Sequence, residues 1–176
     1  MTSSRRSALA ASLSAAILWL ASPAHGDDLP EYRLKAAFVY NFIVYTEWPA
    51  GKITMLNVCI LGTDPFGAEI DGLQGKAVAG LSIAVQRKSA GEPLSNCQVV
   101  FIPASAMQGL PRLLEGLRGQ HVLTVADSPG AMRQGVALNM AVSQGKVTFE
   151  ANLQAARSAG LNLSSKLLRL ATEVKQ

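Results

Sequence analysis

Side chains capable of nucleophilic or metal chemistry are scarce in this sequence. It contains two histidines, His25 and His121, and two cysteines, Cys59 and Cys97. A structural zinc site needs about four ligands at compatible spacing, which these four residues do not offer. The Gly-x-Ser-x-Gly motif that presents the serine of many hydrolases does not occur. The residue types therefore predict no metal site, no catalytic residue and no cofactor.

Two short motifs are similar to known functional motifs but occupy different local structure. Ser143–Lys146 (SQGK) matches Ser-x-x-Lys, which hydrolases place on a helical turn that brings the lysine beside the serine. Here the motif spans a predicted hairpin turn. Leu61–Gly67 (LGTDPFG) joins a predicted strand to a predicted helix, but the carboxylate of Asp64 would occupy the helix amides and repel an anion. We interpret both motifs as structural.

The two cysteines have a different chemistry open to them. In an exported chain, a pair of cysteines without metal-like spacing is typical of a disulfide. A Cys59–Cys97 bridge would close a loop of about 38 residues, worth at most about 4 kcal/mol in the chain-entropy model. The alternative is two buried thiols on neighbouring strands. We predict the bridge.

Polar residues gather near the start of the carboxy-terminal third. Glu150 lies in the predicted strand VTFEAN, where its side chain projects opposite to Phe149 and close to Asn152 and Arg157. One interpretation is a Glu150–Arg157 salt bridge, and the other is a polar recognition site. A single carboxylate without a visible second group does not support general acid catalysis. We therefore take Glu150, Asn152 and Arg157 as candidate residues for contact with a partner or ligand.

Residues 1–26 have the layout of a secretory signal peptide. Two arginines precede an uncharged stretch up to Leu20, and the small-residue tail ASPAHG follows. Cleavage after Gly26 is preferred, and cleavage after Ala24 is the alternative. The remaining chain carries 14 basic and 12 acidic residues without a Lys/Arg cluster, so its net charge is +2 and no nucleic-acid partner is expected. A periplasmic protein is predicted.

The elements that would position these residues begin with an aromatic helix. Tyr32–Trp48 is predicted to be helical and to end at Pro49, with an inward stripe that includes Leu34, Phe38 and Asn41. Its uncharged run from Ala36 to Thr46 has about 11 residues, whereas a membrane span needs about 20. We therefore expect a core helix whose aromatic side chains pack against a sheet.

Strand and helix patterns alternate through the middle of the chain. Apolar runs predict strands at 56–62, 81–89, 97–103 and 121–127, and helical patterns follow at 64–75 and 105–119. A hairpin turning at Gln144-Gly145, a helix from about Asn152 and a last helix from Ser164 complete the pattern. This predicts one domain over 27–176, of α/β class. It has a mostly parallel central sheet, helices on both faces and a carboxy-terminal antiparallel hairpin.

Four blocks of this sequence together resemble the YfiR family of periplasmic regulators. They are YRLKAAFVYNFIVYTEWP, NVCILGTDPFG, CQVVFIP and VTFEANLQAARSAGLNLSSKLLRLA, and they occur in the family's order across nearly all of residues 27–176. The resemblance implies a central sheet flanked by helices. The family's two central cysteines match Cys59 and Cys97 by their strand contexts. A second cysteine pair, present in some relatives, is missing here, which puts redox control by that pair in doubt.

The resemblance also implies a role. YfiR-like proteins inhibit a membrane-bound diguanylate cyclase by binding its periplasmic sensor region, and an outer-membrane, peptidoglycan-associated lipoprotein titrates them away. On this basis we expect a regulator that binds partners and catalyses no reaction. A small-molecule sensor domain serving another membrane signalling system is the alternative, because the crevice at the strand ends of an α/β fold is a ligand site. Whether the chain forms a homodimer stays open.

Overall fold

The computed structural model describes residues 28–49, 51 and 53–176. The predicted signal peptide, residues 1–26, lies outside the described residues. Across the part that is described, no helix has the length and apolar composition needed to cross a bilayer.

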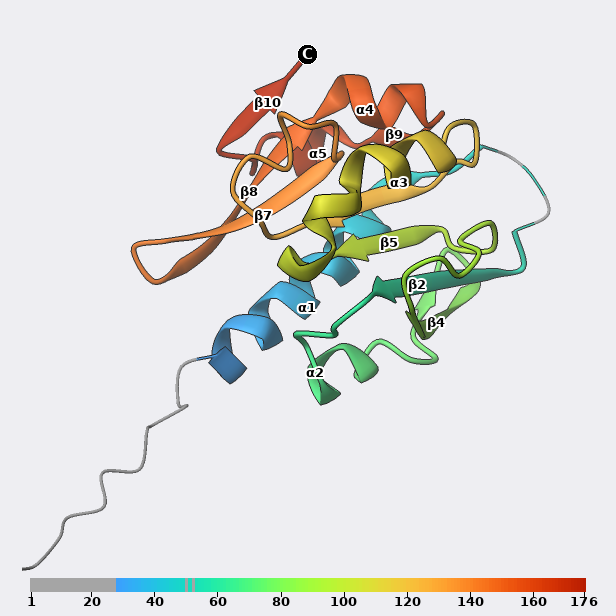
Figure 1. The fold of residues 1–176 in the computed structure, drawn as a ribbon, viewed down its shortest axis with the longest axis horizontal. Helices are drawn as coiled ribbons and strands as arrows, with labels where there is room; N and C mark the ends of the chain where they lie inside the picture. Colours follow the sequence, from blue (N-terminus) through green and yellow to red (C-terminus); the bar gives the residue numbers. More distant parts are fainter. Residues whose placement is uncertain (1–27, 50, 52) are drawn as a thin grey trace, which may run out of the picture.

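A central β-sheet organises the described chain (Figure 1). Its strands are β2 (Met55–Leu61), β3 (Ala77–Val78), β4 (Leu81–Lys88), β5 (Val99–Ile102), β6 (Leu123–Ala126), β7 (Leu138–Ser143), β8 (Lys146–Asn152) and β10 (Glu173–Lys175). Their spatial order is β10-β8-β7-β6-β5-β2-β4-β3. The pairs β3–β4 and β7–β8 are antiparallel and the other pairs are parallel. This confirms the predicted α/β class with a mostly parallel sheet and a carboxy-terminal hairpin.

Helices cover the two faces of this sheet and build a core on each. They are α1 (Asp28–Val44), α2 (Ala68–Asp71), the 3₁₀ helix η1 (Ala104–Gly109), α3 (Leu110–Gly116), α4 (Leu153–Ser158) and α5 (Ser165–Leu168). On one face, α1 packs its Phe42 ring against Phe149 of β8, with ring centroids 5.1 Å apart. On the other face, Leu110 and Leu117 pack with Val100 and Ile102 of β5.

The first helix differs from its prediction in both its bounds and its orientation. It ends at Val44, and Thr46–Glu47 then forms a short strand, β1, that pairs with β9 (Asn162–Leu163). Leu34, which we expected inside, is 50% exposed, whereas Lys35 is only 4% exposed. Asn41 is also exposed rather than packed among aromatic rings. The inward face is therefore rotated from the predicted stripe, because an ion pair holds the lysine inside.

Local sequence signals predicted the carboxy-terminal elements well. Gln144 and Gly145 form the β7–β8 turn with φ of 51° and 71°, the positive values that a two-residue hairpin turn of type I′ requires. Asn152 caps α4 and Ser164 caps α5, each through its side-chain oxygen. The predicted helix start at Asp64 is wrong, because that carboxylate accepts a hydrogen bond from the Phe66 N–H in a turn and α2 begins only at Ala68.

Candidate functional site

A buried lysine links α1 to the carboxyl end of β6. Lys35 Nζ lies 2.8 Å from Oδ2 of Asp127, the residue directly after β6, and it also pairs with Glu31 one helical turn earlier. The side chains of Lys35 and Asp127 are 5% and 4% exposed. A charge removed from water to this degree is tolerated only when it is paired and hydrogen-bonded. The pair therefore fixes the position of α1 over the end of this central strand.

Tyr32 completes the pairing of Asp127. Its hydroxyl donates to the same Oδ2 at 3.0 Å, and Lys35 Nζ lies 4.4 Å from the centre of its ring, a cation–π contact. Burial and the neighbouring Asp127 carboxylate raise the pKa of Tyr32 to about 12. Burial lowers the pKa of Lys35, but hydrogen bonds to Asp127 and Glu31 outweigh it and the net pKa is raised. Tyr32 stays neutral and Lys35 stays charged at physiological pH.

Ser128, the residue after Asp127, extends the polar contacts to the β7–β8 hairpin. The backbone N–H of Ser128 donates to Asn139 Oδ1 at 3.2 Å, and Asn139 Nδ2 donates to Glu150 Oε2 at 3.1 Å. Asn139 of β7 is buried and lies opposite the half-buried Glu150 of β8 in the ladder. Among the described residues, the buried Ser128 hydroxyl has no hydrogen-bond partner. An amide thus holds the Glu150 carboxylate in place.

These contacts define one polar cluster at the α1, β6 and hairpin junction. Its members are Glu31, Tyr32, Lys35, Asp127, Ser128, Asn139 and Glu150. The pKa values raised within it, those of Tyr32 and Lys35, move away from neutrality, so these two groups are unsuited to proton transfer at neutral pH. The carboxylates of Glu31 and Asp127 pair with the Lys35 ammonium group, and the carboxylate of Glu150 accepts a hydrogen bond from Asn139. The cluster is suited to holding structure and presenting charge to a partner.

The predicted contact residues occupy three different environments. Glu150 belongs to the polar cluster. Asn152 is buried: its Oδ1 accepts from the Ala155 N–H at 2.9 Å and its Nδ2 donates to the Met132 carbonyl at 3.1 Å. Arg157 is exposed on α4. Among the described ion pairs, none joins Glu150 to Arg157, so the alternative salt bridge is wrong.

His121 lies at the amino end of β6, away from Asp127 at the carboxyl end. It is exposed, and its Nδ1 is 2.8 Å from the Ala159 carbonyl oxygen. That contact is with backbone and does not join the imidazole to a hydroxyl or thiol nucleophile. Within the described ranges, no group of three or more His, Cys, Asp or Glu residues converges as a metal site would require.

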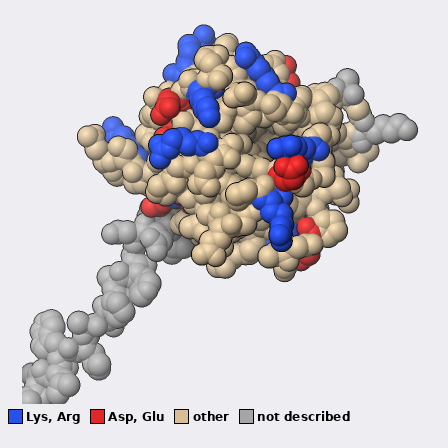
Figure 2. All heavy atoms as spheres, turned by 45° about the horizontal axis from the view of Figure 1, so that its top comes forward, with Lys and Arg blue, Asp and Glu red and all other residues tan. Residues whose placement is uncertain are grey.

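Charged side chains on the surface lie in separate groups. On the face shown in Figure 2, Lys and Arg side chains alternate with acidic and uncharged residues. A group of charges whose pairing is known joins β4 to the α2 region, where Arg87 pairs with Asp64 and Asp71, each at 2.8 Å. Hydrogen bonds to these two carboxylates raise the pKa of Arg87. The charges within this group therefore partly neutralise one another.

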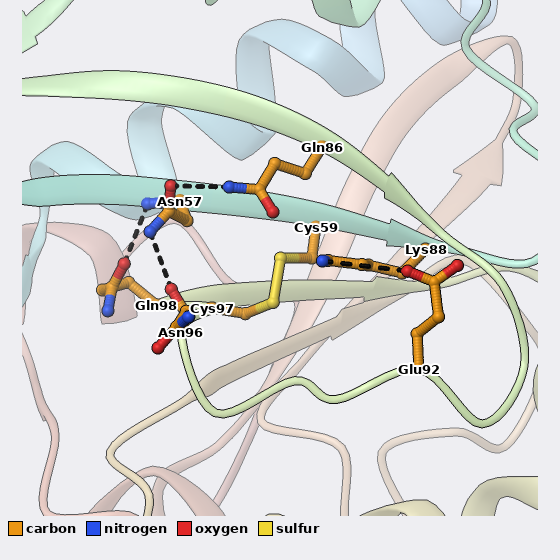
Figure 3. Close-up of a disulfide and its surroundings, with 8 residues drawn as sticks. All are labelled: Asn57, Cys59, Gln86, Lys88, Glu92, Asn96, Cys97 and Gln98. Atoms are coloured by element: carbon orange, nitrogen blue, oxygen red, sulfur yellow. Dashed lines mark hydrogen bonds and ion pairs between the residues drawn. A yellow bond between two sulfur atoms is a disulfide. The ribbon is translucent and has the colours of Figure 1, made fainter.

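The two cysteines form a disulfide, as predicted from the sequence (Figure 3). Cys59 lies on β2 and is fully buried, and Cys97 lies just before β5 and is 2% exposed. Beside the bridge, Asn57 of β2 accepts a hydrogen bond from Gln86 at 2.9 Å and donates one to the Asn96 carbonyl at 2.7 Å. The bridge and these amides attach the segment before β5 to the face of β2.

Sequence reasoning missed the centre of the polar cluster. Lys35 was not singled out, and Asp127 was only the end of a predicted strand. A signal was present, because a polar residue directly after an apolar strand lies at the carboxyl edge of a parallel sheet, where functional groups gather. The partner of Asp127 could not be found in this way, since it lies 92 positions earlier in the chain.

Comparison with known proteins places this architecture in a family. A family model described as YfiR/HmsC-like matches residues 32–172. A crystal structure of a conserved domain protein from Vibrio cholerae O1 biovar eltor has a TM-score of 0.57 and 8% identity over 82% of this chain. The match spans 60% of that protein, and at this identity it concerns the fold alone. No curated protein matches the sequence.

Proposed function

The chain belongs to the YfiR/HmsC-like family, and we propose that it inhibits a membrane-bound diguanylate cyclase by binding the cyclase's periplasmic sensor region. At family level the YfiR-like domain is a periplasmic regulator of cyclic-di-GMP signalling. The family match over residues 32–172 is the observation that carries the proposal. An outer-membrane, peptidoglycan-associated lipoprotein is the proposed competitor that removes the inhibitor.

Features of the chain agree with this role. A disulfide suits an oxidising compartment such as the periplasm, and the first 26 residues read as an export signal. The pKa values that are shifted, those of Tyr32, Lys35, Arg87 and Glu92, all move away from neutrality. Perturbed groups at enzyme active sites are usually tuned toward the working pH instead. These observations support recognition as the function.

Inhibition by contact needs only a difference in affinity. If the regulator binds the inactive conformation of the cyclase more tightly than the active one, its presence shifts the population toward the inactive state. A tenfold preference corresponds to about 1.4 kcal/mol, which a few exposed side chains can supply. Capture of the regulator by the lipoprotein would release the cyclase.

The proposed contact residues are Glu150, half-buried on β8, and Arg157, exposed on α4. The Asn139 amide holds the carboxylate of Glu150, which limits the side-chain entropy lost on binding. Arg157 offers the planar, five-donor guanidinium that is enriched at binding hot spots. Asn152 serves this surface indirectly, by capping the helix that carries Arg157.

The test is capture of the partner from solubilised membranes with the protein without its signal peptide as bait. We expect recovery of a transmembrane diguanylate cyclase, and loss of that recovery in Arg157→Glu, because charge reversal opposes a complementary contact. Arg169→Glu is the matched control, since Arg169 is also exposed but lies at the end of α5. Cells lacking the protein should contain more cyclic-di-GMP.

Two results would contradict the proposal. One is an unchanged cyclic-di-GMP level in the deletion strain under conditions in which the cyclase is expressed. The other is recovery of the same membrane proteins by wild type and Arg157→Glu, which would remove Arg157 from the contact surface while leaving the family assignment intact.

A further inference from the structure

The connection from β4 to β5 is unusual for a parallel pair of strands. Ten residues, 89–98, return from the carboxyl end of β4 to the amino end of β5 without a helix. Parallel crossovers normally need a dozen or more residues and usually contain an α-helix. The segment instead passes over β2, where the Cys59–Cys97 disulfide attaches it (Figure 3). As a result, residues 89–98 place no crossover helix beside α3.

A groove of about 590 Å³ occupies this space between α3 and residues 90–94. It runs along α3 and reaches the carboxyl end of β2 at Leu61 and Gly62. The chain leaves the neighbouring strands β2 and β5 in opposite directions, toward β4 and β6. Such a reversal of strand order opens a crevice, which is the general ligand site of open α/β sheets. Ligand pockets are typically about 300 to 1,000 Å³. Size and position both agree with a small-molecule site.

The wall of the groove is aliphatic. Leu61, Leu94, Leu113 and Leu117 line it, together with alanines and glycines, and no lining residue is aromatic. Leu94 and Leu113 remain half-buried although they pack on the apolar cluster beneath α3. An aliphatic wall without rings gives a flexible hydrocarbon chain good contact but offers no stacking surface for a planar aromatic ligand.

Two charged side chains line the groove, and only one is already paired. Glu92 accepts from the Ser89 N–H at 2.9 Å and lies 3.8 Å from Lys88 Nζ, and these contacts lower its pKa, the Ser89 hydrogen bond most. Arg112 of α3 is exposed and takes part in none of the ion pairs between described residues. The groove therefore combines an apolar wall with one unpaired guanidinium, which suits a carboxylate.

From this combination the structure assigns a second binding site, independent of the partner surface. The groove between α3 and the β4–β5 connection binds an aliphatic monocarboxylate. The hydrocarbon chain lies along the leucine wall and the carboxylate pairs with Arg112. Because α3 and the connection both border the site, a bound ligand would join the disulfide-anchored segment to the helix that covers β5.

Calorimetric titration of the purified, oxidised protein with sodium decanoate below its micelle concentration tests this assignment. We expect saturable binding of decanoate with one site per chain. Acetate, which has the head group without the chain, and decylamine, which has the chain with the opposite charge, should each bind at least about tenfold more weakly. Equal binding of decanoate and decylamine would overturn the role of Arg112.

Two variants locate the site. Arg112→Gln should weaken decanoate binding about tenfold, because it removes a charge-assisted pair, while Arg169→Gln leaves binding unchanged. Gly116→Phe should block the hydrocarbon chain of decanoate. An added Cβ at this lining residue meets no atom within 4 Å, so the phenyl ring can enter the groove without a backbone clash. Circular dichroism checks that each variant is folded. Absence of decanoate binding, or binding that Arg112→Gln leaves unchanged, would overturn the assignment.

Discussion

The effect of Lys35 on stability depends on its ion-pair partner. Its ammonium and the Asp127 carboxylate are both nearly inaccessible to water, and each compensates the other. Removal of one partner leaves an uncompensated buried charge, whereas removal of both does not. Among the described side chains, this pair therefore makes a sharper test of the fold than the exposed ion pairs, which contribute little.

We expect Lys35→Met to lower the free energy of unfolding by about 3 to 5 kcal/mol. The double variant Lys35→Met/Asp127→Asn should recover a large part of that loss, because the buried charge disappears. Urea unfolding of the single and double variants gives the coupling free energy. Lys166→Met, at an exposed lysine of α5, is the control. A loss below about 1 kcal/mol for Lys35→Met would show that water reaches Asp127.

The raised pKa of Tyr32 predicts how the free energy of unfolding depends on pH in the alkaline range. Its folded-state pKa of about 12 is above the ordinary value of 10.0. The unfolded chain therefore loses the phenolic proton first, and stability is full below about pH 10 and falls as pH rises toward about pH 12. Two pKa units correspond to at most about 2.7 kcal/mol, and the partial exposure of the phenol reduces this to about 1 kcal/mol.

Tyr32→Phe should accordingly make the decline of unfolding free energy above about pH 10 shallower. The raised pKa of Lys35 adds a loss in the same direction, so the decline will not vanish. Urea unfolding measured at a series of alkaline pH values checks this, and Tyr45→Phe, a partly buried tyrosine outside the polar cluster, is the control. An identical slope in wild type and Tyr32→Phe would be inconsistent with the Tyr32–Asp127 contact.

At the scale of single residues, the sequence predicted the disulfide but not the contacts of the polar cluster. The disulfide prediction came from a pair of cysteines in a chain expected to be exported. The inward position of Lys35 could not be predicted, because a helical pattern assigns a lysine to the outer face. Only the tertiary placement of Asp127 beside the helix reverses that assignment. The burial of Asn152 was not predicted for a related reason, because its polar groups form hydrogen bonds inside the molecule.

Among the elements, α4 depends on a cap that is shared with a neighbouring loop. Asn152 binds both the first turn of the helix, at Ala155, and the Met132 carbonyl, and it is buried. Ser164 caps α5 through one hydrogen bond, to the Lys166 N–H, near the surface. Two caps of the same kind thus differ in their burial and in the number of groups left unpaired when they are removed.

We expect Asn152→Ala to cost about 2 kcal/mol or more and Ser164→Ala about 1 kcal/mol or less. The larger cost reflects the Met132 carbonyl, which would lose its partner in a buried position. Thermal and urea unfolding of the two variants provide the comparison. Equal losses would mean that water replaces the amide at Met132.

Elements with local signals were predicted, and elements defined by tertiary pairing were not. The hairpin follows from Gln144-Gly145 between alternating strands, and the caps follow from single residues. By contrast, β1 and β9 have only two residues each, and β10 has three. Their extended conformation results from pairing with distant strands, which no local pattern indicates. Pairing with a distant strand also ends α1 at Val44, because Thr46 of β1 pairs with Leu163 of β9.

The disulfide acts at the scale of the whole molecule. It joins the central strand β2 to the beginning of β5 across a sequence separation of 38 residues. The stabilisation predicted for such a loop is about 4 kcal/mol, mainly through restriction of the unfolded chain. Because both cysteines are buried between packed strands, the native sheet should persist after reduction in the absence of denaturant.

We expect Cys59→Ser/Cys97→Ser to unfold at a clearly lower urea concentration than the oxidised protein, by up to about 4 kcal/mol. Wild-type protein with a reductant should approach the variant, and the reductant should not affect the variant itself. Far-ultraviolet circular dichroism without urea should stay native-like in all samples. A variant as stable as the oxidised wild type would contradict the entropic contribution of the bridge.

The class of the whole fold could be predicted, whereas the order of its strands could not. Apolar runs separated by helical patterns indicate a parallel sheet, since parallel strands need crossovers. No residue indicates that β2 lies between β4 and β5, or that β10 returns beside β8. For that reason the groove beside α3 was beyond prediction: it exists because the β4–β5 connection is short and the strand order reverses above it.

The pairing of β1 with β9, and of Phe42 with Phe149, has a consequence for biogenesis. Synthesis proceeds from the amino end, so the first helix emerges long before the strands that shield its rings. Until about residue 163 has left the ribosome, α1 and β1 lack their complete contacts with β8 and β9. If the chain is exported as proposed, late closure of this kind favours its passage through a translocation channel before the fold is complete.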